Sequence, residues 1–528
     1  MRRREFITSG ITASSALAMP RFARAERPDK LIFAPTNDLV VLDPTVTFAR
    51  PTRNHGYLVF DTLYGIDEDW HVRPQMVEGH VVEDDGLTWT LKLRDGLRFH
   101  DGTPVLGRDV VASIRRFAER ISFAGSLMAV TAELSAPDDR TVRFGLRRPY
   151  PHLPDALAGP GGNMPAIMPE RLATGSPFKP VAEIIGSGPY RFLPDEHVSG
   201  AHAAYARFAP YQPRGDGKLG FTSGPKLAHF DRIEWLTLDP VSAMAALRTG
   251  EIDWWESVFR DAVDPLSRDA DLVVISHYAT AMGILRFNHL YPPFDNADIR
   301  RAALGAIDQA EAMIAVAGTE RTNWIDGVGL FPTGTPLAND AGIEIIRGRR
   351  DYEAVRQALV SAGYKGETIV VIASADLPAM QALSVVGADQ LRRAGMNVDL
   401  QEMDAGSALR RRLSQQAPDK GGWNAFFYFL DRSTPTTTPF GNPAIRADGR
   451  ARWGGWPSSE RIESLRTEWL DAAILDEEKR ICRELQMQLW HDVPYIPMGE
   501  YWQATAYRKD LVGVRPGCFP VFWGIHRI

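Results

Sequence analysis

Asp431 ends a strongly aromatic segment, which reads WNAFFYFLD over residues 423–431. An ionised carboxylate forms strong, charge-assisted hydrogen bonds to an ammonium group, above all where water is largely excluded. Asp431 therefore carries a group whose chemistry suits an ammonium ion. A second interpretation stays open, in which Asp431 caps a turn or pairs with the neighbouring Arg432.

Aromatic residues could supply the walls of such a site, because pockets for small molecules are mostly apolar with few polar anchors. The candidates are Trp254, Trp255, Trp423, Tyr428 and Trp453. Trp254 and Trp255 are adjacent, and successive side chains of a strand point to opposite faces. We therefore expect at most one of these two to line a cleft, and packing of both in the core is the alternative.

Two further polar candidates are Asn288 and the run Arg410–Arg412. Asn288 could bind a ligand or stabilise the backbone of a hinge. One arginine of the run could meet a ligand carboxylate, although three consecutive arginines are more typical of a solvated helix face.

The chain lacks the motifs of common catalytic, metal and phosphate sites. It has no GxSxG nucleophile elbow, no HExxH and no phosphate loop ending in Gly-Lys-Ser/Thr. The 12 histidines are scattered. His100 beside Asp101 could suggest a metal site or a proton relay, but two Asp-Gly turns flank it, so we expect a packed ring whose nitrogens meet backbone groups. We expect no enzyme, no cofactor and no metal site.

The overall composition is that of a globular protein, with 528 residues of which 44% are hydrophobic and 24% charged. A single core stops growing at roughly 250–300 residues, so we expect two or more lobes. The net charge of −6 argues against nucleic acid or an anionic membrane as the main partner. Cys482 and Cys518 could form one disulfide or remain two buried thiols, and the sequence leaves both possibilities open.

Residues 1–25 are typical of an export signal. RRREFI at 2–7 contains a twin arginine followed by x-Phe-Ile, which resembles a Tat signal. A weakly apolar stretch covers 11–19, and Ala23-Arg24-Ala25 offers a small-x-small cleavage site. The pattern predicts a soluble mature chain that is exported to the periplasm.

The elements that must position these residues are visible as periodicities. Residues 88–94 alternate polar and apolar, which predicts a half-buried strand, and a helix carrying Val110, Ile114 and Phe117 follows. A helix ending at Gly363, a strand over 368–373, a helix over 382–394 and a strand over 397–401 come later in the chain. This alternation indicates an α/β lobe with a parallel sheet. Leu470, Ile474, Ile481, Leu485 and Leu489 recur at helical spacing and predict one late helix.

Several blocks in fixed order resemble the family 5 extracellular solute-binding proteins of ABC transporters, which include dipeptide, oligopeptide and nickel receptors. The resemblance covers nearly the whole mature chain. The blocks are LDP at 42–44, LKLRDGLRFHDGTP at 91–104 with Arg108-Asp109-Val110, GSGPYRF at 186–192, LRTGEID at 247–253, LRFN at 285–288 with PFD at 293–295 and IRRA at 299–302, and DVPYIP at 492–497.

The resemblance implies an α/β fold of the two-lobed periplasmic-binding-protein type (type II, the large cluster with an extra subdomain) with a hinge-closing cleft. Lobe I would combine 26–56, 186–278 and 494–528, and the extra subdomain would cover 57–185. Lobe II would cover 279–493. Such a receptor acts as a monomer that closes on a small solute and then docks on a membrane permease with its ATPase; no nucleic acid is involved.

The resemblance also bears on the ligand. Peptide-binding relatives place Asp-x-x-x-Pro after an aromatic stretch, and Asp431 and Pro435 match that spacing. This implies a short peptide or another amine-bearing solute held at Asp431. The stretch TPTTTP at 434–439 departs from the peptide receptors. A receptor for a sugar, an opine or a metal chelate is therefore the alternative, with Asp431 engaged by protein partners, and an exported enzyme on this scaffold is a third hypothesis.

Overall fold

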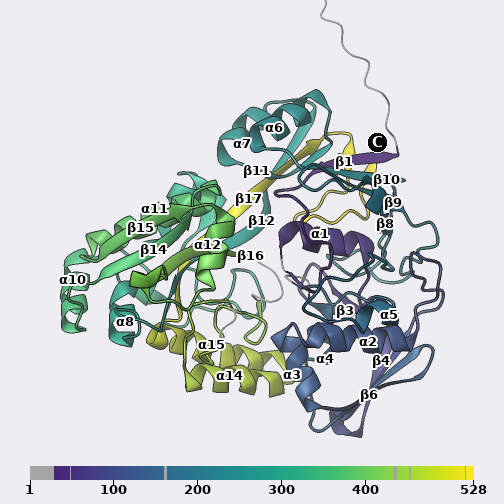
Figure 1. The fold of residues 1–528 in the computed structure, drawn as a ribbon, viewed down its shortest axis with the longest axis horizontal. Helices are drawn as coiled ribbons and strands as arrows, with labels where there is room; N and C mark the ends of the chain where they lie inside the picture. The colour runs from purple at the N-terminus through teal and green to yellow at the C-terminus, as the bar shows by residue number, and fades with distance from the viewer. Residues whose placement is uncertain (1–28, 48, 160–162, 432–436, 451–452, 518) are drawn as a thin grey trace, which may run out of the picture.

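A computed structural model describes residues 29–47, 49–159, 163–431, 437–450, 453–517 and 519–528. The chain forms two lobes that lie side by side and are joined by long strands (Figure 1). The predicted signal at 1–25 and Cys518 lie outside the described residues. Within the described ranges, no helix combines the length and the apolar character needed to cross a membrane.

One large mixed sheet runs through both lobes. Its order is β15-β14-β16-β12-β17-β11-β1-β10-β9-β8, with β13 also paired to β17. The strands are β1 (Lys30–Ala34), β8 (Tyr190–Phe192), β9 (His202–Arg207), β10 (Arg232–Leu236), β11 (Trp254–Val258), β12 (Leu272–Phe287), β13 (Trp324–Ile325), β14 (Thr368–Ser374), β15 (Asn397–Met403), β16 (Ala425–Asp431) and β17 (Tyr495–Arg508).

β12 and β17 are the two long strands at the centre of this sheet. They are antiparallel to each other over most of their lengths, from the pair Leu272 and Arg508 to the pair Arg286 and Tyr495. β17 pairs with β11 towards one lobe, whereas β12 pairs with β16 towards the other. The same two strands therefore contribute to the cores of both lobes.

A separate antiparallel sheet has the order β4-β5-β7-β6 and lies beyond α2, in the lower right of Figure 1. Its strands are β4 (Val77–Glu83), β5 (Thr88–Leu93), β6 (Thr131–Asp138) and β7 (Thr141–Leu146). Two short ribbons pair β2 (Tyr64–Ile66) with β3 (Val72–Pro74), and β18 (Leu511–Val512) with β19 (His526–Arg527).

Helices cover the faces of the sheets. They are α1 (Arg50–Val59), α2 (Gly107–Ala118), α3 (Ser122–Val130), α4 (Leu153–Ala158), α5 (Glu170–Ala173), α6 (Pro240–Thr249), α7 (Arg260–Ser267), α8 (Ala297–Leu304), α9 (Gln309–Ala317), α10 (Tyr352–Ser361), α11 (Pro378–Arg393), α12 (Ala405–Arg412), α14 (Glu460–Asp471) and α15 (Leu475–Asp492).

Most elements predicted from periodicity are confirmed. β5 is the alternating strand, and α2 carries Val110, Ile114 and Phe117 on its buried face. The order α10-β14-α11-β15 is also as expected, and β14 and β15 pair in parallel. α11 begins at Pro378, a few residues before the predicted start, because proline suits the first turn of a helix.

Our prediction of a single late helix is wrong. α14 ends at Asp471 and α15 begins at Leu475. Ile474 precedes α15 and is 66% exposed, so it does not share the buried face of the other four residues. The acidic residues Asp476, Glu477 and Glu478 occupy the first turn of α15, where negative charge favours a helix start.

Cys482 is a free thiol that is buried in the core of the second lobe. Burial raises the pKa of this thiol well above its usual value. The sequence left open a disulfide or a buried thiol, and Cys482 is a buried thiol.

Candidate functional site

Asp431, the last residue of β16, is held by two arginines of α1 across the seam between the lobes. Arg50 Nη2 lies 2.5 Å from Asp431 Oδ1, and Arg50 Nε donates to Oδ2 at 3.3 Å. Arg53 Nη1 donates to the same Oδ2 at 3.2 Å. We call Arg50, Arg53 and Asp431 the interlobe triad. In Figure 1, α1 and β16 face each other from the two lobes.

The local sequence explains the position of each member. Arg50 and Arg53 are three residues apart on α1, a spacing that places both side chains on one face of the helix. β16 is rich in aromatic residues, which suit a half-buried strand, and it pairs with β12 so that Asp431 lies opposite Ala281.

The GSGPYRF block fixes the end of α1 that lies away from the triad. Gly188 N donates to Val59 O at 2.8 Å. A Cβ atom on Gly186 would lie 2.0 Å from the same carbonyl oxygen, so only glycine allows this close approach. The block therefore helps to hold the helix that carries Arg50 and Arg53.

His100, which belongs to the block LKLRDGLRFHDGTP at 91–104, contacts the same turn at Gly188. Its ring Nε2 lies 3.0 Å from Gly188 O, and the ring meets Phe208 edge-on. Burial lowers the pKa of His100 to about 4, so the ring is neutral at pH 7. This is the packed histidine that we expected, with a ring nitrogen against a backbone group.

The electrostatics of the triad favour the charged forms. Burial raises the pKa of Asp431, but the adjacent charges of Arg50 and Arg53 outweigh burial and lower it overall. Burial likewise opposes the charge of Arg50, and Asp431 more than compensates, so the pKa of Arg50 is raised. The triad carries two positive charges and one negative charge, and the negative charge of Glu256 on β11 also favours the charged form of Arg50.

Two neighbouring polar contacts extend the triad. Arg50 Nη1 donates to Gln503 Oε1 at 3.1 Å, and Gln503 Nε2 donates to Tyr501 Oη at 2.9 Å. Asn54, one turn further along α1, donates through its Nδ2 to Glu256 Oε1 at 2.8 Å. α1 is thus tied to β16, β17 and β11.

Trp254 and Trp255 lie in two different hydrophobic cores, as their adjacent positions on β11 require. Trp254 is fully buried beside Phe33 and Phe522, and its Nε1 donates to Thr505 Oγ1 at 2.7 Å. Trp255 is 3% exposed. These positions favour packing over ligand contact for both.

Asn288 and Trp423 lie at the far end of the β12–β16 pair from Asp431. Asn288 Nδ2 donates to Trp423 O at 2.8 Å, and Asn288 Oδ1 accepts from Leu290 N at 3.1 Å. Trp423 is fully buried and packs near Trp456 and Phe426. Asn288 therefore binds backbone groups within the second lobe.

Tyr428 and Trp453 are brought together, with their rings 5.4 Å apart. Arg412, the last residue of the Arg410–Arg412 run, lies against both rings and is only 4% exposed. Arg410 is exposed and Arg411 is half-buried. The prediction of a solvated helix face thus fits Arg410 but not Arg412.

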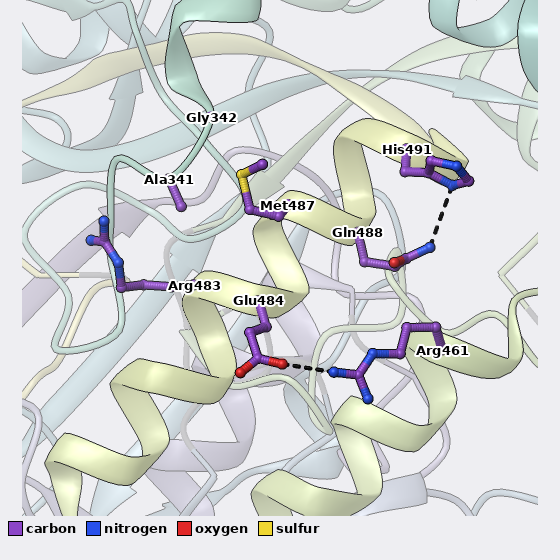
Figure 2. Close-up of a pocket in the computed structure, with 8 residues that line it drawn as sticks. All are labelled: Ala341, Gly342, Arg461, Arg483, Glu484, Met487, Gln488 and His491. Atoms are coloured by element: carbon purple, nitrogen blue, oxygen red, sulfur yellow. Dashed lines mark hydrogen bonds and ion pairs between the residues drawn. The ribbon is translucent and has the colours of Figure 1, made fainter.

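A cavity of about 570 Å³ lies on the outer side of α15 (Figure 2). Arg461 and Glu484 pair at 2.6 Å across it, and Met487, Gln488 and His491 line the rest. None of the residues predicted from the sequence lines this cavity. Its charged groups bind one another, so it is a weaker candidate for solute binding than the seam between the lobes.

The sequence reasoning missed Arg50 and Arg53. Their partner is 381 and 378 residues away in the chain, so no local pattern could reveal the pairing. The spacing of two arginines by three residues after an extended segment was the available signal.

Two α/β lobes that share two long strands and meet through charged side chains define the class of binding proteins that close around a solute. The model for "bacterial extracellular solute-binding proteins, family 5" matches residues 71–446. The chain belongs to this family, and it is a solute-binding protein.

Similar proteins agree with this assignment. The chain is 34% identical over 533 residues to a probable peptide ABC transporter periplasmic-binding protein of Sinorhizobium fredii, with 99% of both chains covered. It is 23% identical over 529 residues to a glutathione-binding protein of Escherichia coli K12, covering 97% of this chain and 96% of that one.

Solved structures show the same fold. An ABC transporter-associated periplasmic binding protein from Helicobacter pylori in complex with a peptide has a TM-score of 0.78 at 18% identity, over 94% of this chain and 98% of that one. A binding protein from A. tumefaciens R10 in complex with agropinic acid has a TM-score of 0.76 at 19% identity, over 93% and 96%.

Proposed function

We propose that the chain is the periplasmic solute receptor of an ABC importer, which captures a small solute between its lobes and delivers it to a membrane permease. The mature chain acts as a monomer. Family membership and the two-lobed fold support this role. The family is a solute-binding one, and capture requires no acid, base or nucleophile.

Lobe closure is the proposed mechanism. A solute that contacts both lobes binds the closed form better than the open form, and this difference in affinity shifts the population. We retain the division into lobe I (26–56, 186–278, 494–528), the extra subdomain (57–185) and lobe II (279–493). The separate sheet β4-β5-β7-β6 within 57–185 supports the subdomain.

The interlobe triad is the observation that bears most directly on the solute. Both carboxylate oxygens of Asp431 already accept hydrogen bonds from guanidinium groups. An ammonium group could bind there only by displacing Arg50 or Arg53. The geometry therefore favours our second hypothesis, a solute such as a sugar, an opine or a metal chelate, whose capture does not depend on an amine at Asp431. A peptide would bind without that anchor.

A thermal-shift screen of the mature protein tests this function. The panel contains Met-Leu and N-acetyl-Met-Leu, glutathione, agropinic acid and a neutral disaccharide. A ligand at 100 times its dissociation constant adds about 2.7 kcal/mol of stability, which gives a readable shift. We expect one panel member to stabilise the protein, with little effect of N-acetylation. Stabilisation by none of them, or conversion of one into a product, would refute the proposal.

Export through the Tat route is the proposed path to the periplasm. Replacing Arg3 and Arg4 with lysine keeps the positive charge of the leader but removes the twin arginine. We expect the double variant to remain in the cytoplasm on cell fractionation while the wild-type chain reaches the periplasm. Normal export of the variant would contradict the Tat assignment.

A further inference from the structure

Arg412 is a buried cation that lies among three aromatic rings. It ends α12 and is 4% exposed. Its guanidinium carbon lies 4.6 Å from the ring centre of Tyr428, 5.0 Å from that of Trp453 and 5.3 Å from that of Phe426. Contacts of this kind hold the planar guanidinium against the rings but leave its N–H groups without acceptors.

No acceptor for Arg412 is present among the described residues. Its Nε is buried and donates no hydrogen bond, and no ion pair joins Arg412 to an Asp or Glu within the described ranges. Two other deeply buried arginines each have a carboxylate partner: Arg466 pairs with Glu463, and Arg116 pairs with Asp43. A buried charge without a counter-ion is costly, so its retention indicates a partner that is supplied from outside the chain.

Arg286 adds a second positive charge to the same region. It is fully buried and lies 5.5 Å from the Trp453 ring centre. Within the part of the chain that the structure describes, it donates only to the carbonyl oxygens of Ala444, Gly454 and Pro494. Burial and, to a smaller extent, the positive charge of Arg412 lower the pKa of Arg286 to about 9. The two guanidinium groups would repel a cation and attract an anion.

We propose that Arg412 and the rings of Phe426, Tyr428 and Trp453 form a carboxylate subsite for the captured solute. The inference rests on the proposed function and adds the chemical class of one end of the solute. A carboxylate can accept two parallel hydrogen bonds from one guanidinium, an arrangement that binds strongly away from water. The aromatic walls favour a carboxylate that is attached to an apolar group.

The placement of the subsite suits a solute held between the lobes. α12 and β16 lie on the side of the second lobe that faces α1 (Figure 1). Tyr428 is only half-buried, so the subsite is open at this ring. Tyr428 and Asp431 are three residues apart on β16 and therefore point to opposite faces. The carboxylate subsite is thus separate from the interlobe triad.

The matched variants Arg412→Met and Arg410→Met test the subsite, since both arginines belong to α12 but only Arg412 is buried. Each protein is titrated calorimetrically with Met-Leu, glutathione and agropinic acid, as free acids and as carboxyl methyl esters. We expect Arg412→Met to lose roughly 10- to 100-fold in affinity for the free acid, the range for charge-assisted hydrogen bonds. Arg410→Met should bind like the wild type.

Two readouts separate a binding role from a structural one. The ligand-free melting temperature of Arg412→Met should be equal to or higher than that of the wild type, because an unpaired buried charge is removed. The wild type should prefer acid over ester, and Arg412→Met should not. A lower melting temperature with unchanged affinity, or a preference for acid that survives in Arg412→Met, would overturn the subsite.

The outcomes also separate this inference from the proposed function. If the wild type binds only the neutral disaccharide, or binds acid and ester equally, the receptor role stands and the carboxylate subsite is wrong. If the wild type binds no panel member, the proposed function fails and the subsite fails with it.

Discussion

The variant Asp431→Asn tests the interlobe triad directly. Asparagine keeps the shape of the side chain and one acceptor oxygen, but it removes the charge that both arginines share. Arg50 is 25% exposed and can regain water, whereas Arg53 is 3% exposed and cannot. A buried arginine would then lack its counter-ion.

The expected cost follows from these exposures. Hydrogen bonds to charged groups contribute about 1.5–3 kcal/mol each, and breaking a fully buried pair costs about 3–5 kcal/mol. Because Asp431 keeps 22% of its side-chain surface exposed, solvent screening lowers the cost. We expect Asp431→Asn to lower the free energy of unfolding by about 2 kcal/mol at pH 7.

Urea denaturation at several pH values measures this loss. The pKa of Asp431 is lowered in the folded chain, so its contribution is present above the unfolded pKa of about 3.9 and is lost as the pH falls through the lower folded pKa. The difference between wild type and variant should therefore shrink below about pH 4. Asp340→Asn is the control, since Asp340 pairs with Arg483 but is 74% exposed. Equal stability of the two variants at pH 7 would refute the reasoning.

Three further perturbations test the packing around the site. Burial alone would lower the pKa of His152, but Asp155 outweighs burial and raises it overall. The stabilisation that His152 provides is therefore present below about pH 6.5 and is lost as the pH rises through the folded pKa. The melting temperatures of wild type and His152→Gln should converge from about pH 6 to about pH 8.5. Cys482 should resist a thiol reagent in the native protein and react in urea; labelling of the folded chain would contradict its burial. Gly186→Ala should lower the free energy of unfolding by about 1–3 kcal/mol or more, because the new Cβ would lie 2.0 Å from Val59 O, and chemical denaturation measures it.

Local pattern was sufficient for most elements and for an α/β lobe, whereas the two-lobed fold class came from the resemblance of ordered blocks to a family. The alternation at 88–93 and the order of helices and strands from 352 to 403 reflect periodicities of 2 and 3.6 residues, which adjacent side chains determine. The late helix shows the limit of this reasoning. Ile474 fits the spacing of its neighbours, but the chain turns at 472–474, and the apolar spacing continues across the break.

The candidate site depends on contacts that local pattern does not contain. Asp431 stood out because of its aromatic segment, yet its partners, Arg50 and Arg53, lie far away in the sequence, near the first strand. Arg410, Arg411 and Arg412 are identical in type, and each is rotated by about 100° from the next around the helix. Which of them is buried depends on how α12 packs in the second lobe, and only the tertiary structure shows this.

We expect the central pair β12 and β17 to act as a flexure, a connection that bends in one direction and stays stiff in the others. Its register shifts between Ile275 and Ala279 and again between Met282 and Ile284, so the pair contains two points where a strand can bend. Between these points the hydrogen-bonded ladder resists stretching and shear. A flexure of this kind has one compliant direction, and the two lobes would therefore return to the same relative orientation in each cycle of capture and release.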